Sequence, residues 1–313
     1  MKQASWAATT MQASSATSTT AIVRHEPAMQ SHRRSASPWG RTSSLTAAIN
    51  MLPIREDDAH RPNPRRLRRS IGRWLPLDDG TLFGRITVLR HGGHKRPVIH
   101  RGSKHLRFRY ASAKTQCTQL GEGHGEQALA MYNEIATHIP FYITHPYEIE
   151  LTVGGRLKRY RPDGVRQFVD GTVELYEVKR TRADLADPEL RETLAQVKEL
   201  ARRSGWIFNV LFLKDILGTE ARQTNVWSLF SRTSLDLSRH HSRIVGRLAG
   251  PGEPIAWGDL AHLLAPNDAL HGDALIECLL AKGRLATDLD LELTPETILM
   301  PVRPFSGASR IEL

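Results

Sequence analysis

Residues 147–213 narrow the choice of fold more than any other part of the sequence. Their apolar residues alternate as in β-strands, and two turn dipeptides, Gly154-Gly155 and Asp170-Gly171, interrupt the alternation. Dipeptides of this kind favour the tight turns of β-hairpins. Strands are therefore expected at 147–153, 157–169 and 172–179. Three strands joined by two short turns predict an antiparallel meander.

A helix and a further strand follow the meander. Asp187 is suited to cap this helix, and Pro188 to occupy its first position. The helix has one apolar face and ends at Gly205; the face comprises Leu190, Leu194, Val197 and Ala201. Residues 206–213 form a short apolar run, which is typical of a buried strand. Strand, helix and strand at this spacing predict a crossover to a parallel neighbour, and hence a mixed-sheet α/β domain over 119–218.

Residues 219–313 are expected to form a second, mainly helical domain. Helical spacing predicts helices at 225–248 (one or two), 255–264 and 272–282. Two strands that pair as a hairpin are expected at 283–289 and 297–300. Helices followed by a hairpin fit a winged-helix module, which binds DNA in many proteins and protein partners in others. Because this segment is not basic, both roles stay open.

Positive charge is concentrated in one part of the chain. Residues 61–115 carry fifteen Lys or Arg against two Asp or Glu, whereas the whole chain has a net charge of +10. Clustered positive charge attracts phosphate, so residues 61–118 are expected to be a basic arm with short strands that contacts the DNA backbone. A solvated basic tail is the alternative. Residues 1–60 begin with a stretch rich in Ser, Thr and Ala, which predicts a disordered tail.

Cysteine usage and hydropathy exclude several classes of protein. The two cysteines, Cys117 and Cys278, are far apart and neither lies in a C-x-x-C motif, which argues against a disulfide framework. No apolar run approaches the roughly 20 residues that a membrane-spanning helix needs. The N-terminus also lacks the apolar core of a secretory signal. A cytoplasmic location is therefore expected.

The residues best suited to chemistry lie on the meander: Asp163, and Glu177 and Lys179 on the strand that follows. Alternate side chains of a strand share a face, so Glu177 and Lys179 lie on the same face as Val173 and Leu175. That face is apolar at its start and charged at its end. A strand that runs out of a core into a functional site has this pattern.

Carboxylates at these positions predict a site for a hard divalent cation. Mg²⁺ takes oxygen ligands, and Asp163, Glu177 and the Val178 carbonyl would supply them, with Mn²⁺ as an alternative ion. Glu126, on a helix expected over 126–138, would complete the ligand set. Lys179 would orient the attacking water or stabilise a phosphate. A surface strand carrying a Glu–Lys pair is the structural alternative.

Two neighbouring acids compete with Glu126 for its role. Glu122 lies in a glycine-rich turn before the helix. Glu134 lies eight residues along the helix, so its side chain is expected to point elsewhere.

The pattern as a whole resembles a known family. Glu126, the segment HPYEIELTVGGRLKRYRPDG (145–164) and the segment VELYEVKR (173–180) are similar to the catalytic domain of TnsA-type transposon endonucleases, in the PD-(D/E)xK nuclease superfamily. Segments 224–230 and 283–297 resemble the C-terminal module of that family. Two departures are Gly164, where the family has Phe, and His145-Pro146, where it has Gln-Pro.

The resemblance implies a restriction-endonuclease-like core and a Mg²⁺-dependent enzyme that nicks double-stranded DNA at transposon ends. It implies catalytic roles for Glu126, Asp163, Glu177 and Lys179. The implied partners are a DDE transposase subunit and an AAA+ ATPase regulator. Two alternatives remain: another nuclease of the superfamily, for restriction or repair, and a non-catalytic DNA-binding assembly protein.

Overall fold

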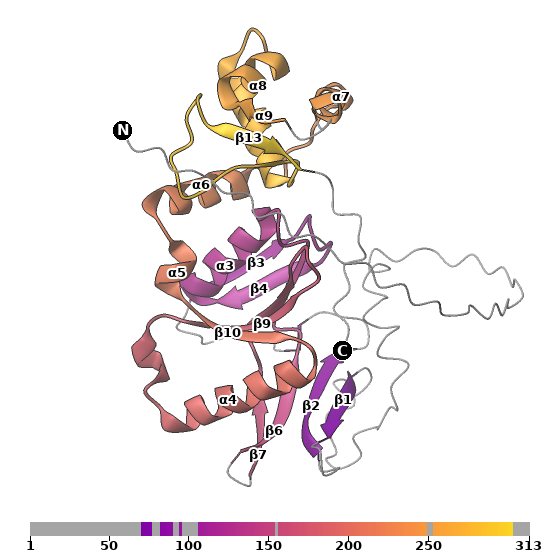
Figure 1. The fold of residues 1–313 in the computed structure, drawn as a ribbon, viewed down its shortest axis with the longest axis vertical. Coiled ribbons are helices and arrows are strands. Elements are labelled where there is room, and N and C mark those ends of the chain that lie inside the picture. Colours follow the sequence, from indigo (N-terminus) through magenta and orange to yellow (C-terminus); the bar gives the residue numbers. More distant parts are fainter. Residues whose placement is uncertain are drawn as a thin grey trace, which may run out of the picture. The chain divides into compact units, whose positions relative to one another are not determined.

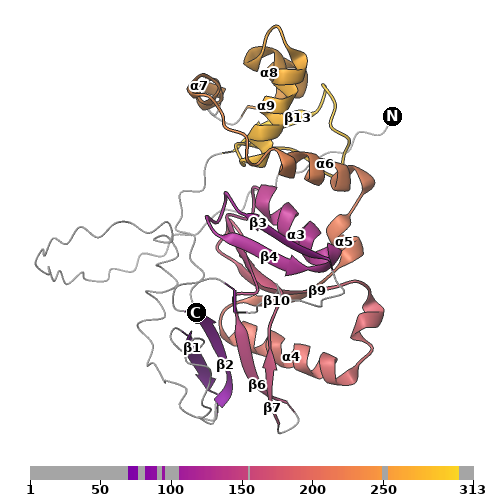
Figure 2. The ribbon, with the colours of Figure 1, turned by 180° about the vertical axis from the view of Figure 1, so that it is seen from behind.

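The computed structural model describes residues 70–76, 82–89, 94–95, 106–153, 156–248 and 253–302 (Figures 1 and 2). The predicted disordered tail at 1–60 and the first part of the basic arm, 61–69, lie outside these residues. Within them the fold is mixed α/β, as the sequence predicts. No helix in the described part is both long and apolar enough to cross a membrane. Cys117 and Cys278 are buried, free thiols.

A central four-stranded sheet has the order β10-β9-β8-β5. Its strands are β5 (Phe141–Thr144), β8 (Gly164–Gln167), β9 (Val173–Lys179) and β10 (Ile207–Phe212). β5, β8 and β9 are antiparallel, and β10 is parallel to β9. The predicted parallel crossover is therefore confirmed. The prediction that 206–213 is a buried strand is wrong, because β10 lies at the sheet edge, where Phe208 is buried and Ile207 exposed.

A second sheet has the order β1-β2-β6-β7. Its strands are β1 (Ser70–Pro76), β2 (Leu82–Leu89), β6 (Glu148–Val153) and β7 (Arg156–Tyr160). The prediction of one strand over 157–169 is wrong: the chain leaves the second sheet after β7 and enters the central sheet at β8. Pro162 lies at this break, because it has no N–H to donate to a ladder. The predicted meander is thus divided between two sheets.

Two helices cover opposite sides of the central strands. Figure 1 shows α3 (Gly123–Ile135) on one side of β9 and β10, and α4 (Pro188–Arg203) on the other. Asp187 caps α4 by accepting a hydrogen bond from the Glu189 N–H (2.9 Å), and Pro188 is the first helical residue, as predicted. The apolar face of α4 packs against residues of both sheets; this core includes Leu194, Val197, Leu200, Leu175, Ile149 and Leu151.

The segment predicted as a basic arm contributes strands to this α/β region. β2 pairs with β6, and β3 (Arg107–Ala111) pairs with β4 (Thr118–Glu122) across the expected domain boundary at 118/119. Two short elements complete the region, the 3-10 helix η1 (Arg182–Leu185) and the helix α5 (Leu213–Leu217).

In the described residues from 220 to 302, the C-terminal region has four helices and a small sheet. The helices are α6 (Glu220–Ser231), α7 (Arg239–Leu248), α8 (Trp257–Leu264) and α9 (Ala269–Ala281). The sheet has the order β11-β13-β12 and consists of β11 (Ile255–Ala256), β12 (Leu285–Ala286) and β13 (Ile298–Pro301). The predicted pairing of the last two strands is confirmed. The helix predicted over 255–264 begins only at Trp257, because Ile255 and Ala256 pair with β13.

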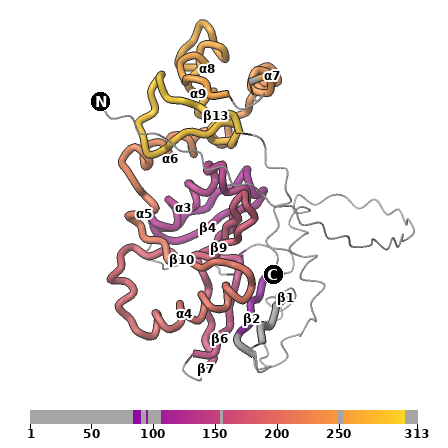
Figure 3. The backbone as a smooth tube through the Cα atoms, viewed as in Figure 1, coloured from indigo at the N-terminus to yellow at the C-terminus, as the bar shows by residue number. Residues whose placement is uncertain are grey.

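The apolar core of the C-terminal region also includes part of α3. Met131 and Ile135 of α3 belong to the same buried cluster as Val226 of α6 and Leu279 of α9. Figure 3 follows the chain from α3, in purple, to α6 and the yellow β13. One helix therefore belongs both to the α/β region and to the C-terminal core.

Candidate functional site

The pairing of strands β5, β8 and β9 brings two predicted site residues into line with one that was not predicted. Gly164, the first residue of β8, lies opposite the last residue of β5 on one side and Tyr176 of β9 on the other. One position further along the ladder are His145, Asp163 and Glu177. The His145 N–H donates to the Asp163 carbonyl at 2.9 Å, which continues the ladder past the strand ends. The three residues therefore lie side by side where β5 ends and β8 begins.

Glu126 reaches this row from α3. Its Oε2 lies 3.0 Å from the Nε2 of His145. One possible ligand atom from each of Glu126, His145 and Asp163 lies within 4.8 Å of the other two. The close approach of α3 requires Gly125, because a Cβ there would lie 2.8 Å from Cγ1 of Val178. Two carboxylates and one imidazole thus form a compact cluster.

Asp163 lies in an environment that disfavours its ionised form. Only 7% of its surface is exposed, and its Oδ2 accepts a hydrogen bond from the Val178 N–H at 2.7 Å. Burial raises the pKa of Asp163 well above its usual range, and repulsion from Glu177 and Glu126 raises it further. In a strand, the N–H and C=O of one residue point to the same side. The Val178 carbonyl, a predicted ligand, is therefore on the Asp163 side of β9.

Glu177 has a fixed partner for each of its carboxylate oxygens. Oε2 accepts from the Tyr160 hydroxyl at 2.5 Å, and Oε1 accepts from Lys179 Nζ at 2.5 Å. Burial acts to lower the pKa of Lys179, but Glu177 and then Asp163 outweigh it and raise that pKa. Burial, together with Glu177, raises the pKa of Tyr160 well above its usual value. At neutral pH, Lys179 is therefore a cation and Tyr160 a neutral donor.

The sequence identifies most of this site and misses one residue. Glu126, Asp163, Glu177 and Lys179 are brought together, with Val178 between the last two. His145 was not predicted as a site residue; the sequence marks it only as a departure from a Gln-Pro pair. Its position depends on the pairing of β5 with β8, which are separated by two strands of another sheet. No local signal reveals that pairing.

The two competing acids have structural roles. Glu134 is buried and accepts hydrogen bonds from Ser112 Oγ (2.6 Å) and from the Tyr142 hydroxyl (2.5 Å). It points away from the cluster, as predicted. Glu122 is the residue before α3 and lies 3.6 Å from Nε of Arg107 on the paired strand β3.

Gly164 has a steric explanation in the structure. A Cβ at this position would lie 2.2 Å from the hydroxyl oxygen of Tyr176 and 2.9 Å from the carbonyl oxygen of Ile143. Tyr176 is buried and fills the space beside the glycine. The aromatic side chain expected after Asp163 therefore has no room, and an aromatic from the neighbouring strand packs there instead.

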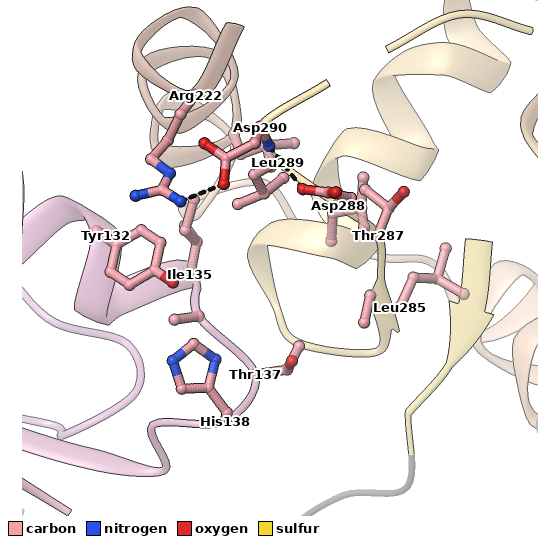
Figure 4. A pocket seen from close by; sticks show the side chains of 14 residues that line it. Tyr132, Ile135, Thr137, His138, Arg222, Leu285, Thr287, Asp288, Leu289 and Asp290 are labelled. Carbon is pink, nitrogen blue, oxygen red and sulfur yellow. Dashed lines mark hydrogen bonds and ion pairs between the residues drawn. The ribbon is translucent and has the colours of Figure 1, made fainter. Parts of the chain in front are cut away.

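A separate cavity of about 170 Å³ lies between α3 and the C-terminal region (Figure 4). In it, Arg222 forms an ion pair with Asp290 and its guanidinium lies 5.8 Å from the ring centre of Tyr132. Figure 4 also shows His138 and Thr137 at the opposite wall. None of the residues that line this cavity belongs to the cluster described above.

Comparisons with known proteins give no family for this chain. No protein-family model matches it, and a search of curated proteins finds no significant match. An assignment of function therefore depends on the chemistry of the cluster and on the sequence pattern.

Proposed function

We propose that this protein is a DNA endonuclease that hydrolyses phosphodiester bonds with the help of a divalent cation, Mg²⁺ or Mn²⁺. The observation that carries the proposal is the meeting of three carboxylates, from Glu126, Asp163 and Glu177, beside the Lys179 ammonium. Carboxylates hold the cation and an ammonium pairs with phosphate, so the group contains what phosphodiester hydrolysis requires.

The chemistry of these residues fits a divalent cation. Glu126 and Asp163 offer oxygen ligands within 4.8 Å of each other. Burial and the neighbouring acids raise the pKa of Asp163, which means that negative charge accumulates here without full compensation. A cation bound between these carboxylates would supply that compensation. When bound, it would also lower the pKa of a water molecule and offset charge on the phosphate.

The remaining residues have separable roles. Lys179, held by Glu177 at 2.5 Å, is positioned to donate to a phosphate oxygen, and its raised pKa excludes a role as a base at neutral pH. Tyr160 is a positioning residue, because its hydroxyl fixes the other oxygen of Glu177. The Val178 N–H orients the carboxylate of Asp163.

The finer assignment is to a TnsA-like subunit of a heteromeric transposase. It is supported by the PD and E-x-K pattern of the sequence, by the β9–α4–β10 crossover and by the helices and β-hairpin at the C-terminus. In this proposal the α/β region is a restriction-endonuclease-like core and the C-terminal region a winged-helix module. A DDE transposase subunit and an AAA+ ATPase are its partners in this proposal, and its location is the cytoplasm, in keeping with two cysteines that lie far apart and outside any C-x-x-C motif.

A nicking assay on supercoiled DNA tests the catalytic assignment. The full chain is assayed with Mg²⁺ or Mn²⁺, with and without the proteins encoded next to it. Asp163→Ala and Lys179→Ala should each abolish cleavage, whereas Asp215→Ala and Lys198→Ala, at exposed residues, should not. Cleavage at the wild-type rate by the Lys179→Ala protein would contradict the assignment.

The same assay separates the transposon role from restriction or repair. Cuts confined to transposon ends, and dependent on a transposase, are expected for a TnsA-like subunit. Cleavage that is independent of any transposase would instead favour another nuclease of the superfamily.

A further inference from the structure

We propose that His145 is a nitrogen ligand of the divalent cation, and that this ligand makes the site prefer Mn²⁺ to Mg²⁺. The inference builds on the metal site of the proposed function, but adds a ligand that the sequence pattern does not contain. It also replaces the expectation of Mg²⁺ as the favoured ion.

The position of His145 is the first argument. Its side chain is fully buried, with 0% of its surface exposed, and its Nε2 faces the cluster, 3.0 Å from Glu126. One of its two ring nitrogens also lies within 4.8 Å of an oxygen of Asp163. A buried imidazole between two carboxylates is a common arrangement in sites of first-row transition metals.

The backbone fixes the position of His145. Its φ is +47°, in the left-handed region, which glycine adopts without cost and which asparagine, aspartate and histidine adopt more readily than other residues. Its N–H donates to the Asp163 carbonyl (2.9 Å), and its own carbonyl accepts from the Lys95 N–H (2.8 Å). These bonds hold a strained residue in place.

The ligand set determines the choice of metal. Mg²⁺ favours an octahedral set of oxygen ligands and retains several waters. Imidazole nitrogen suits transition metals, whereas carboxylates also suit Mn²⁺. One nitrogen with two carboxylates therefore favours Mn²⁺ over Mg²⁺. If His145 were merely an ion-pair partner of Glu126, its replacement would not alter the preference between the two ions.

Calorimetric titration with Mn²⁺ and with Mg²⁺ tests the proposal on the full chain. His145→Asn tolerates the left-handed backbone and offers an amide oxygen in place of nitrogen. The ratio of the Mg²⁺ to the Mn²⁺ dissociation constant should fall by about tenfold or more in this variant. His138→Asn, at an exposed histidine of the same region, is the matched control and should keep the wild-type ratio. An unchanged ratio in the His145→Asn protein would overturn the proposal.

Pulsed electron paramagnetic resonance gives a second readout that needs no substitution at His145. Bound Mn²⁺ in the wild-type protein should show coupling to an imidazole ¹⁴N, and the coupling should be absent from the Asp163→Asn protein. If the spectrum of the wild-type protein shows coupling only to water and carboxylate ligands, the proposal that His145 is a ligand is wrong. If the Asp163→Asn protein binds Mn²⁺ as tightly as the wild type does, the cation site assigned under the proposed function is wrong.

Discussion

Asp163 accepts a hydrogen bond from the Val178 N–H at 2.7 Å, while the acids Glu126 and Glu177 lie close by. Burial first, and then these two carboxylates, raise the pKa of Asp163. Its ionised form is therefore held in the folded protein against an unfavourable electrostatic free energy. Functional sites often carry such a cost to stability.

Asp163→Asn should stabilise the metal-free protein at neutral pH. The folded state holds the Asp163 proton more tightly than the unfolded chain, so stability falls as pH rises from about 4 through the raised pKa. The substitution removes that loss. We expect the free energy of unfolding in urea to increase by at least about 1 kcal/mol at pH 7.5, since one pKa unit corresponds to about 1.4 kcal/mol.

The gain should disappear near pH 4, where Asp163 is protonated in the folded protein. Asp215→Asn, on an exposed residue, should change stability by less than about 0.5 kcal/mol at either pH. A variant at position 163 that is less stable than the wild type at pH 7.5 would show that the carboxylate is not strained.

For single residues, the sequence shows which side chains are suited to a reaction more readily than which side chains lie next to each other in the fold. Asp163, Glu177 and Lys179 can be recognised from residue type, spacing and strand alternation. His145 cannot, because its role depends on a left-handed backbone and on pairing with a distant strand. Gly164 likewise is explained only once Tyr176 is seen to occupy the space beside it.

At the scale of elements, local signals predict α4 and β9 closely. The Asp187 cap, Pro188 and the apolar face of α4 are all present as expected. The single strand predicted over 157–169 fails because its two halves pair with different strands. Pairing of β2 with β6 joins residues more than sixty positions apart, and no short-range pattern specifies it.

The C-terminal end of α3 has an unusual cap. Lys114 Nζ donates to the carbonyl oxygens of Asn133, Ala136 and Ile139, at 2.5, 2.8 and 2.9 Å. Carbonyls at a helix end carry partial negative charge and attract a cation. Burial nevertheless lowers the pKa of Lys114 to about 7. The cap therefore titrates near neutral pH in the folded protein.

Lys114→Met should flatten the dependence of stability on pH above neutrality. The unfolded chain, with a lysine pKa of about 10.4, binds more protons than the folded protein between about pH 7 and 10. Wild-type stability should therefore rise with pH in that window, by up to about 1.4 kcal/mol per pH unit from this residue. Urea unfolding of both proteins at pH 7, 8 and 9 measures the difference.

The loss of three hydrogen bonds should also lower the stability of the Lys114→Met protein at pH 7, by about 1–3 kcal/mol. Lys198→Met, at an exposed position on α4, serves as the control and should follow the wild-type curve. Parallel curves for the Lys114→Met and wild-type proteins would mean that the three carbonyls keep the ammonium charged throughout.

At the scale of the whole molecule, α3 is shared between two cores. Met131 and Ile135 are 2% and 3% exposed and pack in the C-terminal cluster, whereas Ala130 packs with Tyr142 of β5. A domain boundary near residue 218, as expected from the sequence, would leave Met131 and Ile135 without their apolar neighbours. The sequence indicates two regions but not that one helix serves both.

Truncation after residue 218 should therefore destabilise the α/β region. Exposing Met131 and Ile135 loses about 3–6 kcal/mol of apolar burial, at about 1.5–3 kcal/mol for each side chain. Urea unfolding of residues 1–218 against the full chain measures this loss. Trp227→Ala, at an exposed residue of α6, should leave the stability of the full chain nearly unchanged. Equal stability of the truncated and full-length chains would contradict a shared core.

The position of Glu126 on α3 has a mechanical consequence. The helix is 13 residues long, so it spans about 20 Å as a stiff rod. One end is anchored among α6 and α9, and the first turn carries the carboxylate that faces His145. A displacement of the C-terminal core would therefore move Glu126 along with the helix. Under the proposed function, a partner that binds to that core would shift one carboxylate of the cation site from a distance, without touching it.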